Sequence, residues 1–290
     1  MKRASFTSHP SPLILKAPAK INWFLRITGK RDDGYHNISS LFQCVDLYDD
    51  LSFTVAEGLE LISDLDIPIE ENIVYRTACV LKKLTSSRKG AKITLNKNIP
   101  HGAGLGGGSS DAASALKGLN TIWKLGLTGT ELSSIASEIG SDVPFFLKGP
   151  GALAEGRGER LRPMTVFPSV DLLIVKPDVS VSTAWAYSSY DASRKLTKKA
   201  IDIKLFIQAF HKQDFAFLRG LIENDLEKVV AERYPVVGDI KSELARTGAV
   251  ISAMTGSGSA VFGVFENRKK AEEAAKAVQP HWSRVVKTLI

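Results

Sequence analysis

The chain has 290 residues, of which 44% are hydrophobic and 24% charged, a balance typical of a globular protein with one or two domains. Its net charge of +7 is spread along the chain, which favours a pocket for an anionic substrate over a nucleic-acid or membrane surface. No run of about 18 apolar residues occurs and no apolar signal region lies near the start, so we expect a cytoplasmic protein without a membrane span.

The chain contains two cysteines, Cys44 and Cys79, and both lie in apolar stretches. A disulfide is not expected in a chain of this length with no other cysteine, so both are predicted to be buried free thiols. No group of cysteines and histidines has the spacing of metal ligands. The sequence therefore predicts no metal centre built from protein side chains.

The first predicted elements are strands. Residues 13–27 have strand character, interrupted at 17–22, and an Asp-Gly turn follows within 31–34. The apolar run 38–45 leads to a further strand near 50–55. A hairpin is therefore expected at the start of the chain.

Helical spacing of apolar residues predicts a helix over 73–84, and alternation predicts a strand over 91–95. A glycine-rich stretch follows, and behind it one helix face is marked by Ala112, Leu116, Leu119 and Trp123. Thr128 and Glu131 form a capping box that begins another helix, which Gly140 is expected to end.

Glycine and proline are frequent in 148–163, which predicts a passage towards a domain boundary. Strands and helices then alternate. The predicted strands cover 171–175, 250–254 and 259–265, and the predicted helices cover 202–232, 235–247 and 267–278. This mixture indicates an α+β protein.

The glycine-rich stretch runs from Pro100 to Ser110 and leads directly into a helix. Glycine allows the backbone to approach an anion closely, and the start of the helix adds free N–H donors and the positive end of its dipole. Ser109 and Ser110 add hydroxyl donors. The stretch is therefore predicted to bind phosphate, and its predicted ligands are Pro100, Gly102, Ala103, Gly104, Leu105, Gly106, Gly107, Gly108, Ser109 and Ser110.

Other interpretations of this loop fit less well. Gly102, Gly104 and Gly107 match a dinucleotide-binding pattern, but no acidic residue follows at the distance needed to hold a ribose, the nearest being Glu131. The lysine of a Walker A loop is missing, and so are the catalytic motifs of protein kinases. A flexible turn without a ligand is the remaining alternative.

The loop, with its Gly-Leu-Gly-Gly-Gly-Ser-Ser run, resembles the ATP-binding motif of the GHMP kinases, named for galactokinase, homoserine, mevalonate and phosphomevalonate kinases. The segments at 17–22 and 255–260 resemble the family's first and third motifs. The resemblance implies a two-domain α+β fold: an ATP-binding domain, residues 1–165, with a left-handed β-α-β unit, and a ferredoxin-like domain, residues 166–290. Ser257 and its glycine neighbours are then expected to lie behind the phosphates.

The resemblance also implies catalytic roles for two residues, Asp142 as general base and Lys20 as its electrostatic partner. Asp142 lies between Gly140 and Pro144, so it is expected to project from a stiff turn. A nearby ammonium favours an ionised carboxylate and stabilises charge that develops on the phosphoryl oxygens. The alternatives are a turn acid and a surface lysine.

Further segments resemble the family member that phosphorylates a cytidine-linked polyol, among them Gly34-Tyr-His, Leu41-Phe-Gln and Gly140-Ser-Asp-Val-Pro. The resemblance implies Tyr35 and Tyr187 as a stacking pair for the cytosine and His36 as a reader of its edge. The polar linker or the polyol is assigned to Asn22 and Thr183, and the apolar side of the polyol pocket to Phe42. Ordinary packing of these aromatic side chains remains the alternative.

The expected ligands are therefore ATP and a small cytidine-linked polyol, with Mg²⁺ accompanying the ATP and no evident protein ligand for it. A monomer or a weak homodimer is expected, with no nucleic-acid or membrane partner. Two other functions stay open: a kinase for homoserine, mevalonate or a sugar, and a nucleic-acid-binding protein.

Overall fold

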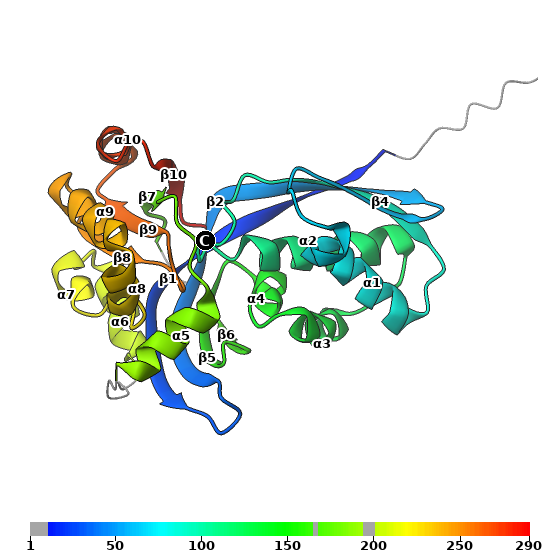
Figure 1. Ribbon diagram of the computed structural model, residues 1–290, viewed down its shortest axis with the longest axis horizontal. Helices are drawn as coiled ribbons and strands as arrows, with labels where there is room; N and C mark the ends of the chain where they lie inside the picture. The colour runs from blue at the N-terminus through cyan, green and yellow to red at the C-terminus, as the bar shows by residue number, and fades with distance from the viewer. Residues whose placement is uncertain (1–10, 165–167, 194–200) are drawn as a thin grey trace, which may run out of the picture.

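The computed structural model describes residues 11–164, 168–193 and 201–290. Figure 1 shows two groups of elements, one around β2, β4 and helices α1 to α4 and the other around β7 to β10, with the long strands β1 and β2 running between them. The predicted boundary between 165 and 166 lies outside the described residues. The two sheets and their helices confirm the predicted α+β class.

The chain begins with a long antiparallel hairpin, β1 (Leu13–Lys30) and β2 (His36–Ala56). The predicted Asp-Gly turn connects them, with Gly34 at φ +82°. Each strand is continuous where the sequence predicted an interruption. Register shifts in the pairing, one of them between Pro18 and Ala19, accommodate the proline within a single strand.

Four further strands complete the first sheet: β3 (Leu59–Ser63), β4 (Gly90–Asn96), β5 (Gly151–Gly156) and β6 (Arg160–Pro163). The order is β3-β4-β2-β5-β6, with β1 on β2, and β3 pairs with β4 in parallel. Most of the passage 148–163 forms β5 and β6, two strands that were not predicted from the sequence, and its place before a domain boundary stays a prediction. Small residues such as Ala152 and Ala154 are buried where β5 pairs with β2. Because the segment is rich in glycine and other small residues, its sequence resembles that of a loop.

Helices α1 (Ile73–Thr85), α2 (Gly107–Trp123), α3 (Gly129–Ile139) and α4 (Val143–Lys148) belong to this half, and a short 3₁₀ turn, η1 (Ile69–Glu71), precedes α1. The predicted face of α2 is buried in the core. The capping box of Thr128 and Glu131 is present, and Gly140 ends α3 as predicted.

The two cysteines are free thiols, as expected, but they differ in burial. Cys44 lies in the core on β2, whereas Cys79 is exposed on α1, so its predicted burial is wrong. The buried face of α1 consists of Val74, Thr77, Ala78 and Leu81. Residue 79 lies outside that helical spacing, and an apolar neighbourhood in the sequence does not reveal this.

The second sheet is antiparallel in the order β10-β7-β9-β8, formed by Trp282–Lys287, Asp171–Lys176, Val261–Phe265 and Ile251–Met254. Its helices include α5 (Thr183–Ala192), α9 (Pro235–Arg246) and α10 (Arg268–Ala277). Strand β10 and helix α5 were not predicted.

The single helix predicted over 202–232 is wrong, because three helices occupy that range: α6 (Ile203–His211), α7 (Phe215–Arg219) and α8 (Glu227–Arg233). The break after α6 lies at Gln213, whose φ is +54°. Asp214 then caps α7 by accepting from the N–H of Phe217 at 3.0 Å. A helix begins anew at that cap.

The hairpin β1–β2 contributes to the cores of both halves. Trp23 on β1 is fully buried and meets Phe210 and Phe262 of the second half edge-on, at ring-centroid distances of 4.8 and 5.7 Å. Its indole N–H donates to Gln43 Oε1 at 2.6 Å. The amide of Gln43 donates in turn to the carbonyl of Leu289 at 2.9 Å. One pair of strands therefore fixes the second half against the first.

Gly118 in α2 permits close packing of Phe53 from β2, because a Cβ at this position would lie 2.6 Å from Phe53 Cε2. We expect Gly118→Ala to destabilise the protein by about 1–2 kcal/mol. The strain of overpacking, about 1–3 kcal/mol, exceeds the gain in helix propensity of about 1 kcal/mol. Urea denaturation measures the change.

Gly129→Ala is the matched control, since Gly129 lies at the start of α3 and a Cβ there would meet nothing within 4 Å. It should be neutral or stabilising. A Gly118→Ala protein as stable as the unsubstituted chain would contradict this account of the packing.

Candidate functional site

A pocket of about 970 Å³ lies where the two halves meet. Its wall combines β1 and β2, the glycine-rich loop, the start of α2, helix α5 and the turn around Ser257. Every predicted catalytic and substrate-binding residue lines it, and so do Pro100 and residues 102–109 of the loop.

The loop depends on glycine for its backbone conformation. Gly102, Gly104 and Gly106 have φ of +64°, +76° and +70°, a region that other residues rarely adopt. Gly106 is the N-cap of α2, so the first turn of the helix begins inside the pocket wall. The N–H groups of a first helical turn have no partner within the helix and are available to an anion.

The loop packs tightly against the other two glycine-containing motifs. A Cβ on Gly104 would lie 2.3 Å from the carbonyl oxygen of Thr255. The carbonyl of Leu105 accepts from the N–H of Lys20 at 2.9 Å, and that of Ala103 accepts from Ala260 at 3.1 Å. Three segments far apart in the sequence are therefore held together by backbone contacts.

The two serines of the loop differ in position. Ser109 lines the pocket, whereas Ser110 is fully buried and does not. Its hydroxyl has no hydrogen-bond partner among the described residues. The structure therefore places Ser109, but not Ser110, where a hydroxyl can meet a ligand directly.

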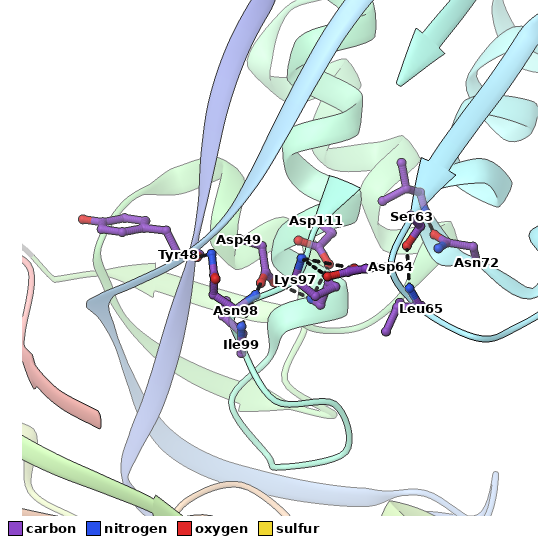
Figure 2. Close-up of polar contacts among 11 residues, drawn as sticks. Tyr48, Asp49, Ser63, Asp64, Leu65, Asn72, Lys97, Asn98, Ile99 and Asp111 are labelled. Atoms are coloured by element: carbon purple, nitrogen blue, oxygen red, sulfur yellow. Dashed lines mark hydrogen bonds and ion pairs between the residues drawn. The ribbon is translucent and has the colours of Figure 1, made fainter. Parts of the chain in front are cut away.

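Sequence reasoning missed a group of charged side chains at the two ends of the loop, drawn in Figure 2. The ammonium of Lys97 lies between the carboxylates of Asp49 and Asp111. Burial and the charge of Asp49 raise the pKa of Asp111 to about 7, with the Lys97 ammonium opposing them. Asp111 directly follows the glycine-rich stretch and Lys97 lies three residues before it, a signal that sequence reasoning had available, whereas Asp49 comes from a distant strand.

The predicted catalytic pair is brought together in the pocket. Lys20 Nζ lies 3.7 Å from Asp142 Oδ2, with the lysine side chain 4% exposed and the aspartate 32%. The ammonium also donates to Asn22 Oδ1 at 2.5 Å and lies 4.7 Å from the centroid of the Phe42 ring. Burial lowers the pKa of Lys20, and the carboxylate of Asp142 opposes this shift.

Asp142 occupies the N-cap position of α4, with Pro144 in the first turn. Its side chain makes no capping hydrogen bond to the helix, so the carboxylate is directed to the pocket, which it lines. The expected stiff turn is present. The predicted role of Asp142 as general base remains a prediction.

Asn22 and Thr183 are held by hydrogen bonds to neighbouring side chains. The backbone N–H of Asn22 donates to the hydroxyl of Thr255 at 2.9 Å, and its side-chain amide donates to Ser40 Oγ at 2.8 Å. The hydroxyl of Thr183 lies 2.8 Å from that of Ser257. Both side chains are thereby fixed in place at the pocket wall.

The predicted aromatic pair has a different arrangement. Tyr187 stacks on His36 at a centroid distance of 5.0 Å and an angle of 24°. Tyr35 is 57% exposed, with the guanidinium carbon of Arg157 at 4.7 Å from its ring centroid. Tyr35, His36 and Tyr187 all line the pocket without the two tyrosines stacking on each other.

His36 is anchored by residues that sequence reasoning did not single out. Its Nε2 lies 2.7 Å from Asp191 Oδ1, and Lys30 Nζ lies 2.7 Å from the other carboxylate oxygen. Partial burial raises the pKa of Asp191, but the hydrogen bonds from Lys30 and His36 outweigh it and lower the pKa. One carboxylate thereby holds both the imidazole of His36 and the ammonium of Lys30.

The pocket extends past the loop into an apolar end that sequence reasoning also missed. Leu65, Ile67, Ile73 and Leu95 line it beside Asn72. Asn72 is the N-cap of α1, and its side-chain oxygen accepts from the N–H of Val74 at 2.9 Å.

No cluster of three or more His, Cys, Asp or Glu side chains with metal-binding geometry occurs in residues 11–164, 168–193 and 201–290. Over the same residues, no helix has the length and apolar character needed to cross a bilayer. Magnesium that arrives with a nucleotide needs only one or two protein oxygens. Ser109 and Asp142 line the pocket and carry suitable atoms.

Comparison with known proteins gives matches to two family models. The model of the GHMP kinases N terminal domain matches residues 72–150, and the model of the GHMP kinases C terminal domain matches residues 206–284. A 4-diphosphocytidyl-2-C-methyl-D-erythritol kinase from Thermodesulfovibrio yellowstonii is 44% identical over 96% of this chain and 98% of its own length. One from Chlorobium phaeobacteroides is 41% identical over 92% and 94%.

A crystal structure of 4-(cytidine 5'-diphospho)-2C-methyl-D-erythritol kinase superposes with a TM-score of 0.82 at 31% identity, covering 95% of this chain and 99% of that one. The predicted fold is thereby confirmed at the level of the family. The full-length matches and the two domain models agree with the three motifs that meet at the pocket. This chain belongs to the GHMP kinase family.

Proposed function

We propose that this protein transfers the γ-phosphoryl group of ATP to the 2-hydroxyl of 4-diphosphocytidyl-2-C-methyl-D-erythritol, a step of the non-mevalonate isoprenoid pathway. The observation that carries the proposal is the Lys20–Asp142 pair, 3.7 Å apart, in the same pocket as the glycine-rich loop. The names of relatives at 41–44% identity support this choice of substrate.

ATP lies with its phosphates against the loop. The residues at the start of α2, Ser109 among them, line the pocket, and their N–H groups and the serine hydroxyl are donors for phosphate oxygens. The adenine then occupies the apolar end beside Ile73 and Leu95. This orientation directs the γ-phosphate towards Lys20, whose backbone N–H is bonded to the loop.

The acceptor hydroxyl lies beside Asp142. The carboxylate takes the hydroxyl proton, the oxygen attacks the γ-phosphorus, and the bond from that phosphorus to the bridging oxygen of ADP breaks. The ammonium of Lys20 offsets negative charge on the moving phosphoryl group. When ATP is bound, Mg²⁺ would supply further charge neutralisation, and Ser109 and Asp142, which line the pocket, would be the residues to hold it.

The cytidine occupies the part of the pocket near α5. Tyr35 and the stacked pair of His36 and Tyr187 provide aromatic surfaces for the base. Asn22, Phe42 and Thr183 surround the polyol and its linker. We also infer that the reaction takes place in the cytoplasm, where ATP is available.

A coupled assay of ADP release tests the acceptor. We expect release with 4-diphosphocytidyl-2-C-methyl-D-erythritol and only background release with homoserine or mevalonate. The aromatic surfaces of the pocket near α5 can stack on a base, and neither small acid carries one. Comparable rates with homoserine or mevalonate would replace the proposed acceptor while keeping the kinase chemistry.

The catalytic pair is tested by Asp142→Asn and Lys20→Met. Each should reduce kcat at least about 100-fold, because general-base help contributes about 10²- to 10⁴-fold and the ammonium neutralises charge in the same step. ATP binding, measured by calorimetry with a non-hydrolysable analogue, should be largely kept in Asp142→Asn.

Lys117→Met is the matched control for Lys20→Met. Lys117 is also partly buried, burial lowers its pKa too, and its ammonium donates to the carbonyl of Phe146 at 2.8 Å, but it does not line the pocket. Its kcat should stay close to that of the unsubstituted protein. Near-normal turnover of Asp142→Asn would remove the carboxylate from the mechanism.

The anchoring of His36 is tested by Asp191→Asn, which keeps the size of the side chain and removes its charge. A lost hydrogen bond to a charged group corresponds to about 1.5–3 kcal/mol, so we expect KM for the cytidine substrate to rise about tenfold or more. KM for ATP should not change, since the loop is not involved. Equal rises in both constants would indicate a general loss of structure instead.

A further inference from the structure

We propose that Asp49, Lys97 and Asp111 form a clamp that fixes both ends of the glycine-rich loop and so prepares its backbone for ATP. These are positioning residues, because none needs to touch a phosphate for the clamp to act. The proposal rests on the proposed function in one respect only, the placement of ATP phosphates on the loop. Figure 2 shows the three side chains converging beside the loop.

The first end of the loop is held by Asp49 of β2. Its Oδ1 accepts from the backbone N–H of Asn98 at 2.6 Å and from that of Ile99 at 2.8 Å. These two residues immediately precede Pro100. The carboxylate is fully buried, so these hydrogen bonds do not compete with water.

The second end is held through Lys97. Its ammonium contacts Asp49 Oδ2 and donates to Asp111 Oδ2 at 2.7 Å, and Asp111 lies in α2 just after the loop. A Cβ on Gly107 would be 3.3 Å from Lys97 Nζ, so the ammonium lies against the first residue of the helix. One ammonium thereby connects the chain before the loop to the chain after it.

The backbone of Lys97 is fixed as well, because its N–H donates to the carboxylate of Asp64 at 3.2 Å. The side chain of Lys97 is 9% exposed and both carboxylates that it meets are nearly inaccessible. Although Lys97 lines the pocket, its ammonium is engaged by two acids of the protein. Its charge therefore serves the loop and not a phosphate.

Fixing both ends matters because the loop contains glycines with positive φ, and glycine loses the most conformational freedom on ordering. A loop that is ordered before ATP arrives does not lose that freedom on binding. Fold stability alone does not explain the cluster, since apolar replacements of buried ion pairs are often neutral or stabilising. The clamp explains why charges are kept there.

The test measures ATP binding by calorimetry with a non-hydrolysable analogue, and KM for each substrate. Asp49→Asn should weaken analogue binding and raise KM for ATP by about tenfold or more, because hydrogen bonds to a buried charge are lost. KM for the cytidine substrate should stay within about twofold. Asp111→Asn keeps an oxygen acceptor for Lys97 and should have a smaller effect.

A double-mutant cycle separates the clamp from independent effects. Asp111 acts on the first end of the loop only through Lys97, so Asp111→Asn should change analogue affinity less in a Lys97→Met background than alone. Additive effects would overturn the connection through one ammonium. If Asp49→Asn does not fold, this cycle still tests whether Lys97 connects the two ends of the loop.

Leu244→Ala is the control for lost stability, because Leu244 is fully buried in α9 and does not line the pocket. It should lower the midpoint of urea unfolding without changing analogue affinity. A folded Asp49→Asn protein with unchanged affinity, or an equal loss in Leu244→Ala, would overturn the proposal. Calorimetry does not require the acceptor, so a failure of the proposed acceptor leaves this test intact.

Discussion

The close approach of three backbone segments at the pocket is the constraint on which the rest of the site depends. The loop carbonyls of Ala103 and Leu105 bond to the second half and to β1, and Gly104 leaves no room for a side chain against Thr255. Because Lys20 is bonded to the loop through its own N–H, the position of its ammonium follows from the position of the phosphate donors. The same backbone contacts therefore fix the positions of the groups proposed for catalysis and for phosphate binding.

The hairpin β1–β2 links the position of the site to the packing of both halves of the molecule. It carries Lys20, Asn22 and Phe42 towards the pocket and Trp23 into the core of the second half. Successive residues of a strand point to opposite faces, so Asn22 and Trp23 serve the site and the core from adjacent positions. A shift of the hairpin by one residue would exchange these roles, which links the packing of the second half to the geometry of the site.

Much of the site could be predicted from the sequence, because its chemistry is carried by short contiguous motifs. The glycine loop, Lys20 with Asn22, and Asp142 between Gly140 and Pro144 each have a local signature. The missed residues lack one: Asp49 and Asp191 act through contacts 48 and 155 residues distant in sequence, with Lys97 and His36. Helices and strands were predicted where apolar residues recur at a regular spacing. The strands β5, β6 and β10 were missed, because their small or mixed residues show no regular alternation of apolar and polar side chains.

The burial of Lys20 suggests how the empty and loaded pockets differ electrostatically. With one carboxylate at 3.7 Å, burial still outweighs attraction and lowers the pKa of the lysine. A phosphate chain laid on the adjacent loop adds negative charge within the same low-dielectric region, which favours the ammonium form. Nucleotide binding thus strengthens the positive charge that the transferred phosphoryl group requires. In the proposed reaction, the pair beside the loop is thereby suited to act after ATP has bound, when the acceptor hydroxyl meets a charged lysine.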